Sequence, residues 1–409
     1  DSFELDGGCI PSDIIEKDLE LLIKPNSPYF LMFDYQFEVF SKTKEKLSLP
    51  TSRRLIRVPT GGGKTKIAME IVADFFNENK SSTIVWLAET EELLNQAANE
   101  FKKIWQHRGM KKVYVNRGWG TKNKIKPNIK DSKIIIAGLS KIMSYLSKDQ
   151  FKADLIIFDE AHHSAAPEYR KAIRTLSKSS TKILGLTATP ARGTEEETQK
   201  LMDLFHGNVP IQINTHDELI SPVKFLQKKG VLAKLIFKPT IKIPEMSTKF
   251  TKIEIKKLLK SSDYTDKKIL IKIGQDHLRN IRIAEKLLEL NEEKKQVLYF
   301  APSVEQSKLM HVLLTNFGIK SGVVDAKTPK EYRAELISKF QKKEINFLLN
   351  YNVFVAGFDA PVVDTVFIGR PTKSPNSLLQ MIGRGMRGPN VIGGTSQCDI
   401  YFVEDKLLA

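Results

Sequence analysis

The stretch from Arg54 to Thr65, which reads RLIRVPTGGGKT, places the strongest constraint on how this chain can fold. Its apolar run at 55–58 predicts a buried strand, and the apolar periodicity of 67–76 predicts a helix directly after the glycines. An order of strand, glycine loop and helix suits the binding of a phosphate group. The glycines let backbone N–H groups approach the anion, and the start of the helix supplies the positive end of its dipole.

Inside this loop, the residues expected to line bound phosphates are Thr60, Gly61, Gly62 and Gly63. Lys64 is expected to reach the β- and γ-phosphates of a nucleotide, and the hydroxyl group of Thr65 is expected to ligate Mg²⁺. The usual pattern has a small residue where this chain has Val58. Because glycine-rich turns before a lysine also occur in ordinary loops, the prediction of nucleotide binding depends on the rest of the chain.

Short apolar runs alternate with helical patterns along both halves of the chain. The predicted strands are 83–88, 112–115, 133–137, 154–158 and 182–186 in the first half, and 296–300, 320–324, 345–349, 364–369 and 398–403 in the second. The predicted helices between them are 91–105, 167–176, 304–316, 329–341 and 377–383. Nearly continuous apolar strands separated by helices indicate parallel sheets covered on both faces, so an α/β fold is expected in each half.

The length of 409 residues favours two domains over one. We expect an N-terminal extension at 1–30, a first domain at 31–228 and a second at 229–409, because 205–265 is proline-containing and less regular. No apolar run is long enough to span a membrane, and no signal sequence precedes the first helix, so a cytoplasmic location is expected. The chain begins at Asp1 without a methionine, and the sequence leaves open whether it is a segment of a longer protein.

The net charge of +16 points to a polyanionic partner, although a solvated lysine-rich surface would give the same figure. Cys9 and Cys398 lie far apart in the sequence and are expected to be reduced thiols. A basic segment at 117–126 contains Trp119, which would stack on a base if it were exposed. The alternative for this segment is an ordinary solvated loop.

Two acids, Asp159 and Glu160, directly follow the apolar run at 155–158. Ligands collect at the carboxyl ends of parallel strands, so both acids are expected beside the phosphate loop. Asp159 suits a Mg²⁺ ligand, and Glu160 suits a general base that orients water. A strand-end acid pair can also serve as a helix cap, but together with Lys64 the catalytic interpretation is favoured.

Two further groups of residues carry polar chemistry. The hydroxyl groups of Thr187 and Thr189 follow another predicted strand and could sense the phosphate site through hydrogen bonds. Gln380, Arg384 and Arg387 are spaced at i, i+4 and i+7, which would place them on one face of a helix. Guanidinium groups aimed at a transferring phosphoryl group would neutralise its developing charge, whereas the same face could instead hold nucleic-acid phosphates.

The motifs VPTGGGKT, DEAH, TATP, GFDAP and QMIGRGMR follow one another in this order, and the chain thereby resembles superfamily 2 helicases and translocases. Finer detail is similar to the restriction-enzyme res-subunit branch and its RadD-like and XPB-like relatives, through Ser221–Gly230, Arg370–Ser374 and the GPNVIGG segment after Arg387. The resemblance implies two RecA-like domains, each a parallel sheet flanked by helices, with the ATP site in the cleft between them.

The same resemblance implies roles for further residues. Gln36 matches a glutamine that reads adenine, while His162 and Gln380 match positions that link the two domains. Gly357 and Asp359 match a motif that contacts both nucleotide and nucleic acid. The residues implied to touch nucleic acid are Thr90, Gly138, Thr328 and Arg333. The chain departs from the family pattern at Gly138, where many relatives have threonine, and at 355–356, which are Val and Ala.

Together these features predict a nucleic-acid-dependent ATPase that uses ATP and Mg²⁺ and steps along nucleic acid as a helicase or translocase, with DNA favoured over RNA. DNA repair, restriction or phage defence are the expected settings, with room for partner subunits or further domains. The alternatives are an ATP-switched nucleic-acid-binding scaffold with little turnover, an RNA helicase, and a phosphate-loop ATPase that acts on proteins.

Overall fold

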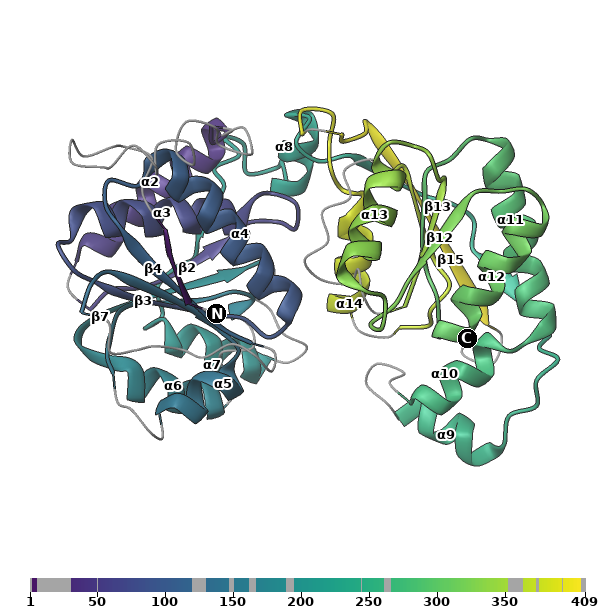
Figure 1. The fold of residues 1–409 in the computed structure, drawn as a ribbon, viewed down its shortest axis with the longest axis horizontal. Coiled ribbons are helices and arrows are strands. Elements are labelled where there is room, and N and C mark those ends of the chain that lie inside the picture. Colours follow the sequence, from purple (N-terminus) through teal and green to yellow (C-terminus); the bar gives the residue numbers. More distant parts are fainter. Residues whose placement is uncertain are drawn as a thin grey trace. The chain divides into compact units, whose positions relative to one another are not determined.

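The computed structural model describes residues 2–5, 31–49, 51–119, 130–146, 151–161, 167–188, 195–243, 245–260, 266–351, 363–372, 375–391 and 393–405. The chain divides into two compact units, Asp1–Pro222 and Val223–Ala409 (Figure 1). The sequence-based boundary at residue 228 lies six residues further along the chain.

Unit 1 is built on an eight-stranded sheet in the order β1-β4-β5-β3-β6-β7-β2-β8. Its strands are β1 (Ser2–Leu5), β2 (Arg53–Arg57), β3 (Thr83–Leu87), β4 (Val113–Gly118), β5 (Lys133–Ala137), β6 (Ala153–Phe158), β7 (Ser177–Thr187) and β8 (Ile211–Gln212). Neighbouring strands are parallel, except that β1 lies antiparallel to β4 at one edge.

Helices cover both faces of this sheet. They are α2 (Asp34–Ser48), α3 (Lys64–Glu78), α4 (Glu91–Arg108), α5 (Leu139–Leu146), α6 (Pro167–Leu176) and α7 (Glu195–Leu204). Helices α2, α3 and α4 lie on one face and α5, α6 and α7 on the other (Figure 1). Strands β3 and β5 are buried along their whole length, as strands covered on both faces must be.

Unit 2 contains a seven-stranded parallel sheet in the order β10-β15-β14-β11-β13-β12, with β9 also paired to β15. Its strands are β9 (Lys234–Phe237), β10 (Ile241–Ile243), β11 (Val297–Phe300), β12 (Ser321–Val324), β13 (Phe347–Asn350), β14 (Thr365–Ile368) and β15 (Gln397–Asp405). Its helices are α8 (Pro222–Lys228), α9 (Lys252–Lys260), α10 (Lys267–Gly274), α11 (His277–Glu292), α12 (Val304–Asn316), α13 (Lys330–Gln341) and α14 (Pro375–Ile382). Helices α9 and α10 extend beyond one end of the sheet (Figure 1).

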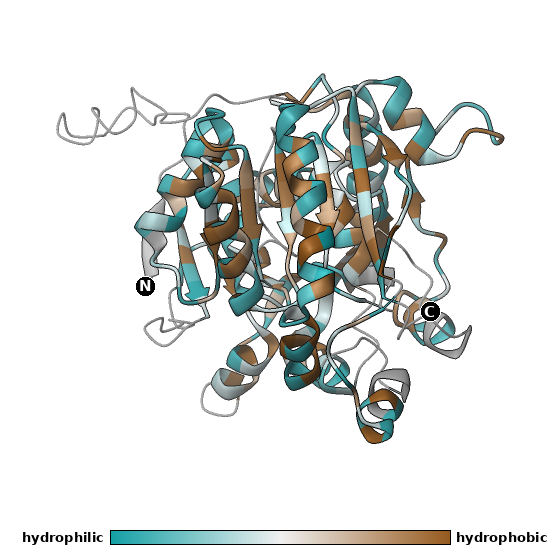
Figure 2. Ribbon diagram, turned by 90° about the vertical axis from the view of Figure 1, so that its right-hand side faces the viewer, coloured by the Kyte–Doolittle hydropathy of each residue, from teal (hydrophilic) through white to brown (hydrophobic). Residues whose placement is uncertain are grey.

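The hydropathy pattern explains why helices cover the sheets. The strands are largely apolar, whereas the helices carry apolar and polar residues (Figure 2). In unit 1 the apolar faces of α3 and α4 meet through Phe76, Phe101 and Trp105, whose ring centroids lie 5.6–6.0 Å apart. No described helix is long and apolar enough to cross a membrane.

The expectation of two α/β domains of RecA-like architecture is confirmed, and each predicted strand has a counterpart in one of the two sheets. The short strands β1, β8, β9 and β10 and the helices α5, α7, α8, α10 and α11 were not predicted. Helix α11 carries a recognisable signal, since Ile283, Leu287 and Leu290 recur at helical spacing and are buried.

Candidate functional site

The glycine loop connects β2 to α3 and is anchored to the neighbouring strand β7. The N–H group of Val58 donates to the carbonyl oxygen of Thr187 at 3.1 Å. Gly61 and Gly63 have φ values of 82° and 85°, which side-chain-bearing residues rarely adopt. Val58 is fully buried, so the larger residue at this position packs into the core instead of narrowing the loop.

Helix α2 holds the loop from its other side through Tyr35 and Gln36. The Tyr35 hydroxyl group donates to the carbonyl oxygen of Gly62 at 2.9 Å, and the Gln36 Nε2 atom donates to the same oxygen at 3.2 Å. The Gln36 Oε1 atom accepts from the N–H group of Phe33 at 3.0 Å. Burial raises the pKa of Tyr35, so its hydroxyl group remains a donor at neutral pH.

The contribution of Tyr35 was not predicted from the sequence, although Tyr35 directly precedes the glutamine that was singled out. A Cβ atom at Gly63 would collide with the Gln36 side chain. The loop therefore needs glycine at this position for space as well as for backbone conformation.

The predicted acid pair lies at the end of β6, within reach of the first residue of α3. Lys64 Nζ is 3.6 Å from Glu160 Oε1. The Asp159 N–H group donates to the carbonyl oxygen of Leu87 at 2.9 Å, which fixes the start of the turn. Glu160 has a φ of 53°, a left-handed conformation that is uncommon for residues other than glycine and often marks a functional site.

Burial and the nearby Glu160 carboxylate together raise the pKa of Asp159 to about 7, against the opposing effects of Lys64 and of the Glu160 N–H group. Asp159 is only 7% exposed, so its negative charge has little water to stabilise it. A divalent cation would supply the missing positive charge, and the carboxylate of Asp159 with the hydroxyl of Thr65 is a hard oxygen donor set of the kind that Mg²⁺ prefers. The residues present therefore fit a Mg²⁺ ion that arrives with nucleotide phosphates.

Of the remaining predicted residues, one lies beside the glycine loop and four cannot be placed. Thr187 is fully buried at the end of β7, where its carbonyl oxygen contacts the glycine loop. His162, Thr189, Gly357 and Asp359 lie outside the described residues.

The arginine-bearing segment of unit 2 differs from the predicted helix. Helix α14 ends at Ile382, Gly383–Gly385 forms a single 3₁₀ turn, and Arg387 forms an antiparallel β-bridge with Leu232. The prediction that Gln380, Arg384 and Arg387 share one helical face is therefore wrong, because the glycines at 383 and 385 end the helix. Burial lowers the pKa of both arginines to about 10, so both remain charged at neutral pH.

Of the four residues implied to touch nucleic acid, Thr90, Gly138 and Thr328 follow strand ends, and Arg333 lies in the first turn of α13. Thr90 caps α4 by accepting from the N–H group of Leu93 at 3.3 Å, and Gly138 precedes α5. Their strands, β3 and β5, are neighbours, so Thr90 and Gly138 follow the same edge of the unit 1 sheet.

In unit 2, Thr328 and Arg333 both bind Asp325 in the connection between β12 and α13. The Thr328 Oγ1 atom accepts from the Asp325 N–H group at 2.9 Å, and Arg333 Nη2 donates to the Asp325 carbonyl oxygen at 3.1 Å. These contacts order the loop that carries Thr328 and tie it to Arg333 on α13.

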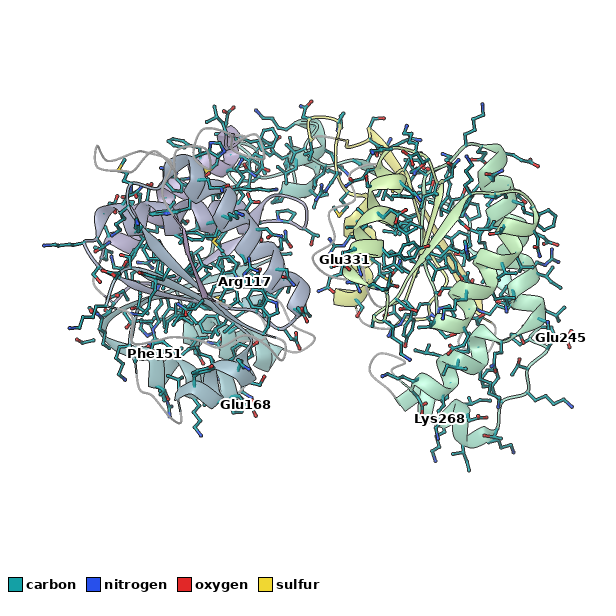
Figure 3. The ribbon with its side chains drawn as sticks, viewed as in Figure 1. Arg117, Phe151, Glu168, Glu245, Lys268 and Glu331 are labelled. Atoms are coloured by element: carbon teal, nitrogen blue, oxygen red, sulfur yellow. The ribbon has the colours of Figure 1, made fainter. Side chains whose placement is uncertain are left out.

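Trp119 is not the exposed platform that the sequence allowed. It is only 8% exposed, and the guanidinium carbon of Arg117 lies 5.9 Å from the centre of its ring (Arg117 is labelled in Figure 3). Burial of the indole ring against unit 1 leaves no face open for a base. Residues 120–126 of the same basic segment lie outside the described ranges.

Two family models match the chain. Residues 29–192 match the type III restriction enzyme res subunit, and residues 279–388 match the helicase conserved C-terminal domain. The first match contains the glycine loop and the acid pair, and the second contains Gln380, Arg384 and Arg387.

Similar curated proteins include the putative ATP-dependent helicase IRC3 of Saccharomyces cerevisiae, at 28% identity over 87% of this chain and 49% of that protein. The DNA 3'-5' translocase XPB2 of Sulfurisphaera tokodaii is 24% identical over 87% of this chain and 78% of its own length. The chain spans about half the length of IRC3.

Solved structures with the same fold include a fragment of a putative HsdR subunit of a type I restriction enzyme from Vibrio vulnificus. Its TM-score is 0.62 at 20% identity, over 97% of this chain and 67% of that one. The Hef helicase domain of Pyrococcus furiosus has a TM-score of 0.54 at 19% identity, over 90% of this chain and 95% of that one. The res-subunit domain at 29–192, the helicase C-terminal domain at 279–388 and the relatives support a superfamily 2 helicase of the res-subunit and XPB-like branch.

Proposed function

We propose that this chain is a nucleic-acid-dependent ATPase that acts as a DNA helicase or translocase. The observation that carries the proposal is the gathering of Lys64, Asp159 and Glu160 at the glycine loop, with Lys64 Nζ 3.6 Å from Glu160 Oε1. The similarity to IRC3, named a putative ATP-dependent helicase, and to XPB2, named a DNA 3'-5' translocase, supports the same activity.

In this proposal ATP is the substrate and unit 1 binds its phosphates. The backbone of Thr60–Gly63 and the Lys64 ammonium group hold the phosphate oxygens, and Gln36 reads the adenine base from its position beside the loop. Thr65 and Asp159 would hold Mg²⁺, which would neutralise charge at the phosphates. Glu160 accepts the proton of the attacking water, and the nearby Lys64 ammonium group orients its carboxylate.

Unit 2 contributes positive side chains that stabilise the negative charge developing on the phosphoryl group during its transfer. Arg384 and Arg387 act as arginine fingers, which requires closure of the two units around ATP. His162, Thr187, Thr189 and Gln380 couple the two units, and Gly357 with Asp359 senses both ligands. Repeated closure and opening while the chain grips a nucleic-acid backbone would give directional stepping.

The nucleic-acid contacts in this proposal are Thr90 and Gly138 in unit 1 and Thr328 and Arg333 in unit 2. DNA is favoured over RNA because the relative XPB2 is a DNA translocase. Because the chain spans about half of IRC3, further domains or partner subunits of a repair or defence complex are part of the proposal.

A Glu160→Gln variant tests the assigned base. We expect its ATP turnover to fall by at least about a hundredfold while ATP binding persists, because the amide cannot accept the proton of water. The measurement is steady-state phosphate release with single-stranded DNA, duplex DNA, RNA or no polymer, alongside ATP binding by fluorescence. Full turnover in the variant would remove Glu160 from its role, and negligible turnover of the wild-type chain with every polymer would favour the ATP-switched scaffold.

A further inference from the structure

The first residues of unit 2 are hydrogen-bonded to the loop that carries Arg387. The N–H group of Ala233 donates to the carbonyl oxygen of Met386 at 2.8 Å, and the N–H group of Gly388 donates to the carbonyl oxygen of Val231 at 2.9 Å. Between these two bonds, Leu232 and Arg387 form an antiparallel β-bridge. The segment 231–233 thus holds the backbone on both sides of Arg387, at Met386 and at Gly388.

A second set of hydrogen bonds holds the loop that carries Arg387 (386–391 and 393–395, the arginine loop) against the end of α8. The N–H group of Asn390 donates to the carbonyl oxygen of Gly230 at 2.8 Å, and Asn390 Nδ2 donates to the carbonyl oxygen of Lys229 at 2.8 Å. On its other side the loop closes on itself, because the Thr395 N–H group donates to the Arg387 carbonyl oxygen at 2.9 Å.

The segment 229–233 and the arginine loop form a junction that close backbone packing makes rigid. A Cβ atom at Gly388 would collide with the carbonyl group of Gly230, and one at Gly394 would collide with the carbonyl group of Gly388. Val231 and Leu232 are 2% and 1% exposed, so water does not compete for their backbone hydrogen bonds. The junction joins segments far apart in the sequence and leaves the Arg387 backbone little freedom to move independently of 229–233.

We propose that residues 229–233 are a positioning element for Arg387. These residues follow α8 directly, and α8 begins at the boundary between the two units. A displacement of the connection would therefore be transmitted through the β-bridge to the arginine. The inference rests on the proposed function, in which Arg387 stabilises charge on the transferring phosphoryl group, and it adds that the connection sets where that arginine lies.

A Gly230→Ala variant tests the element, with Gly318→Ala as its matched control. Both glycines follow helices, α8 and α12, and have φ values of 65° and 74°. A Cβ atom at Gly230 would lie 2.8 Å from Asn390 Nδ2, whereas nothing lies within 4 Å of one at Gly318. Both variants should therefore share the backbone strain of alanine in this conformation, and only Gly230→Ala should disturb the arginine loop.

We expect Gly230→Ala to lower the kcat of nucleic-acid-stimulated ATP hydrolysis by about tenfold with KM for ATP unchanged, because the loss is confined to the transition state. Gly318→Ala should keep the wild-type kcat, although its thermal midpoint falls through the same backbone strain. Equal kcat values in the two variants would overturn the proposal.

A double-mutant cycle separates positioning from general damage. In an Arg387→Ala background, Gly388→Ala should cause no further loss of kcat if the junction acts through Arg387. If the two substitutions instead lower kcat by independent factors, the junction has a structural role only. This result would overturn the inference and leave the proposed function intact. Wild-type kcat in Arg387→Ala alone would instead remove the proposed role of the arginine itself.

Discussion

At the scale of single residues, the protein environment of Asp159 disfavours the ionised form of its carboxyl group. Burial and the Glu160 carboxylate raise its pKa to about 7, from an ordinary value of 3.8. The folded chain therefore retains a proton on Asp159 at pH values where the unfolded chain has lost it. Stability from this group is fully present below about pH 4 and declines as the pH rises to about 7, because unfolding then releases a proton.

An Asp159→Asn variant should remove this dependence. Without nucleotide or Mg²⁺, we expect the variant to gain stability relative to the wild-type chain as the pH rises from about 4 to about 7, since the amide stays neutral throughout. Thermal unfolding of both chains at several pH values measures the difference. A difference that does not change with pH would contradict the raised pKa.

The sequence predicted those site residues whose neighbours are close along the chain. Lys64 and the glycines belong to one strand, loop and helix, so their placement follows from local pattern. The position of Arg387 was missed because it depends on Leu232, a partner about 155 residues away, and no periodicity reports such a contact. Trp119 was misjudged for a related reason, since a basic sequence around an aromatic residue does not reveal whether its ring is buried.

At the scale of helices and strands, the extension formed by α9 and α10 is attached to unit 2 through Asp276. This side chain is fully buried, and its Oδ2 atom accepts from the Thr248 N–H group at 2.7 Å and from Ser247 Oγ at 2.9 Å. Its Oδ1 atom accepts from the Arg279 N–H group at 2.9 Å and caps α11. One carboxylate thus joins the chain before α9 to the helix after α10 (Lys268 on α10 is labelled in Figure 3).

Replacing this carboxylate should cost more than replacing an ordinary cap. We expect Asp276→Ala to lower the free energy of unfolding of unit 2 by about 3 kcal/mol, because it leaves buried donors without an acceptor. Asp266→Ala is the control, since Asp266 caps α10 at a more exposed position and should cost about 1 kcal/mol. Denaturant unfolding measures both, and equal losses would show that Asp276 serves only as a cap.

At the scale of the whole molecule, the net charge of +16 favours association with a polyanion. Each phosphate that a lysine or arginine neutralises releases a condensed counterion, so binding weakens as salt is added. This term does not depend on base sequence and suits a chain proposed to move along its partner.

The affinity for DNA should therefore fall by at least about tenfold between about 50 and about 200 mM salt. Fluorescence anisotropy with a labelled oligonucleotide measures this change, and ATP affinity in the same buffers is the control for general effects of salt. A DNA affinity that is insensitive to salt would indicate contacts of another kind, and the charge would then be a feature of the solvated surface.

The position of β15 in the unit 2 sheet determines when that sheet can be completed during synthesis of the chain. The first strands of this unit, β9 and β10, both pair with β15, the last described strand. During synthesis on the ribosome, unit 1 can complete its sheet while unit 2 still lacks the strand that receives its earliest segments. Assembly of unit 2 thus ends by joining its two extremes, and the arginine loop between them is among the last parts of the protein to reach its final position.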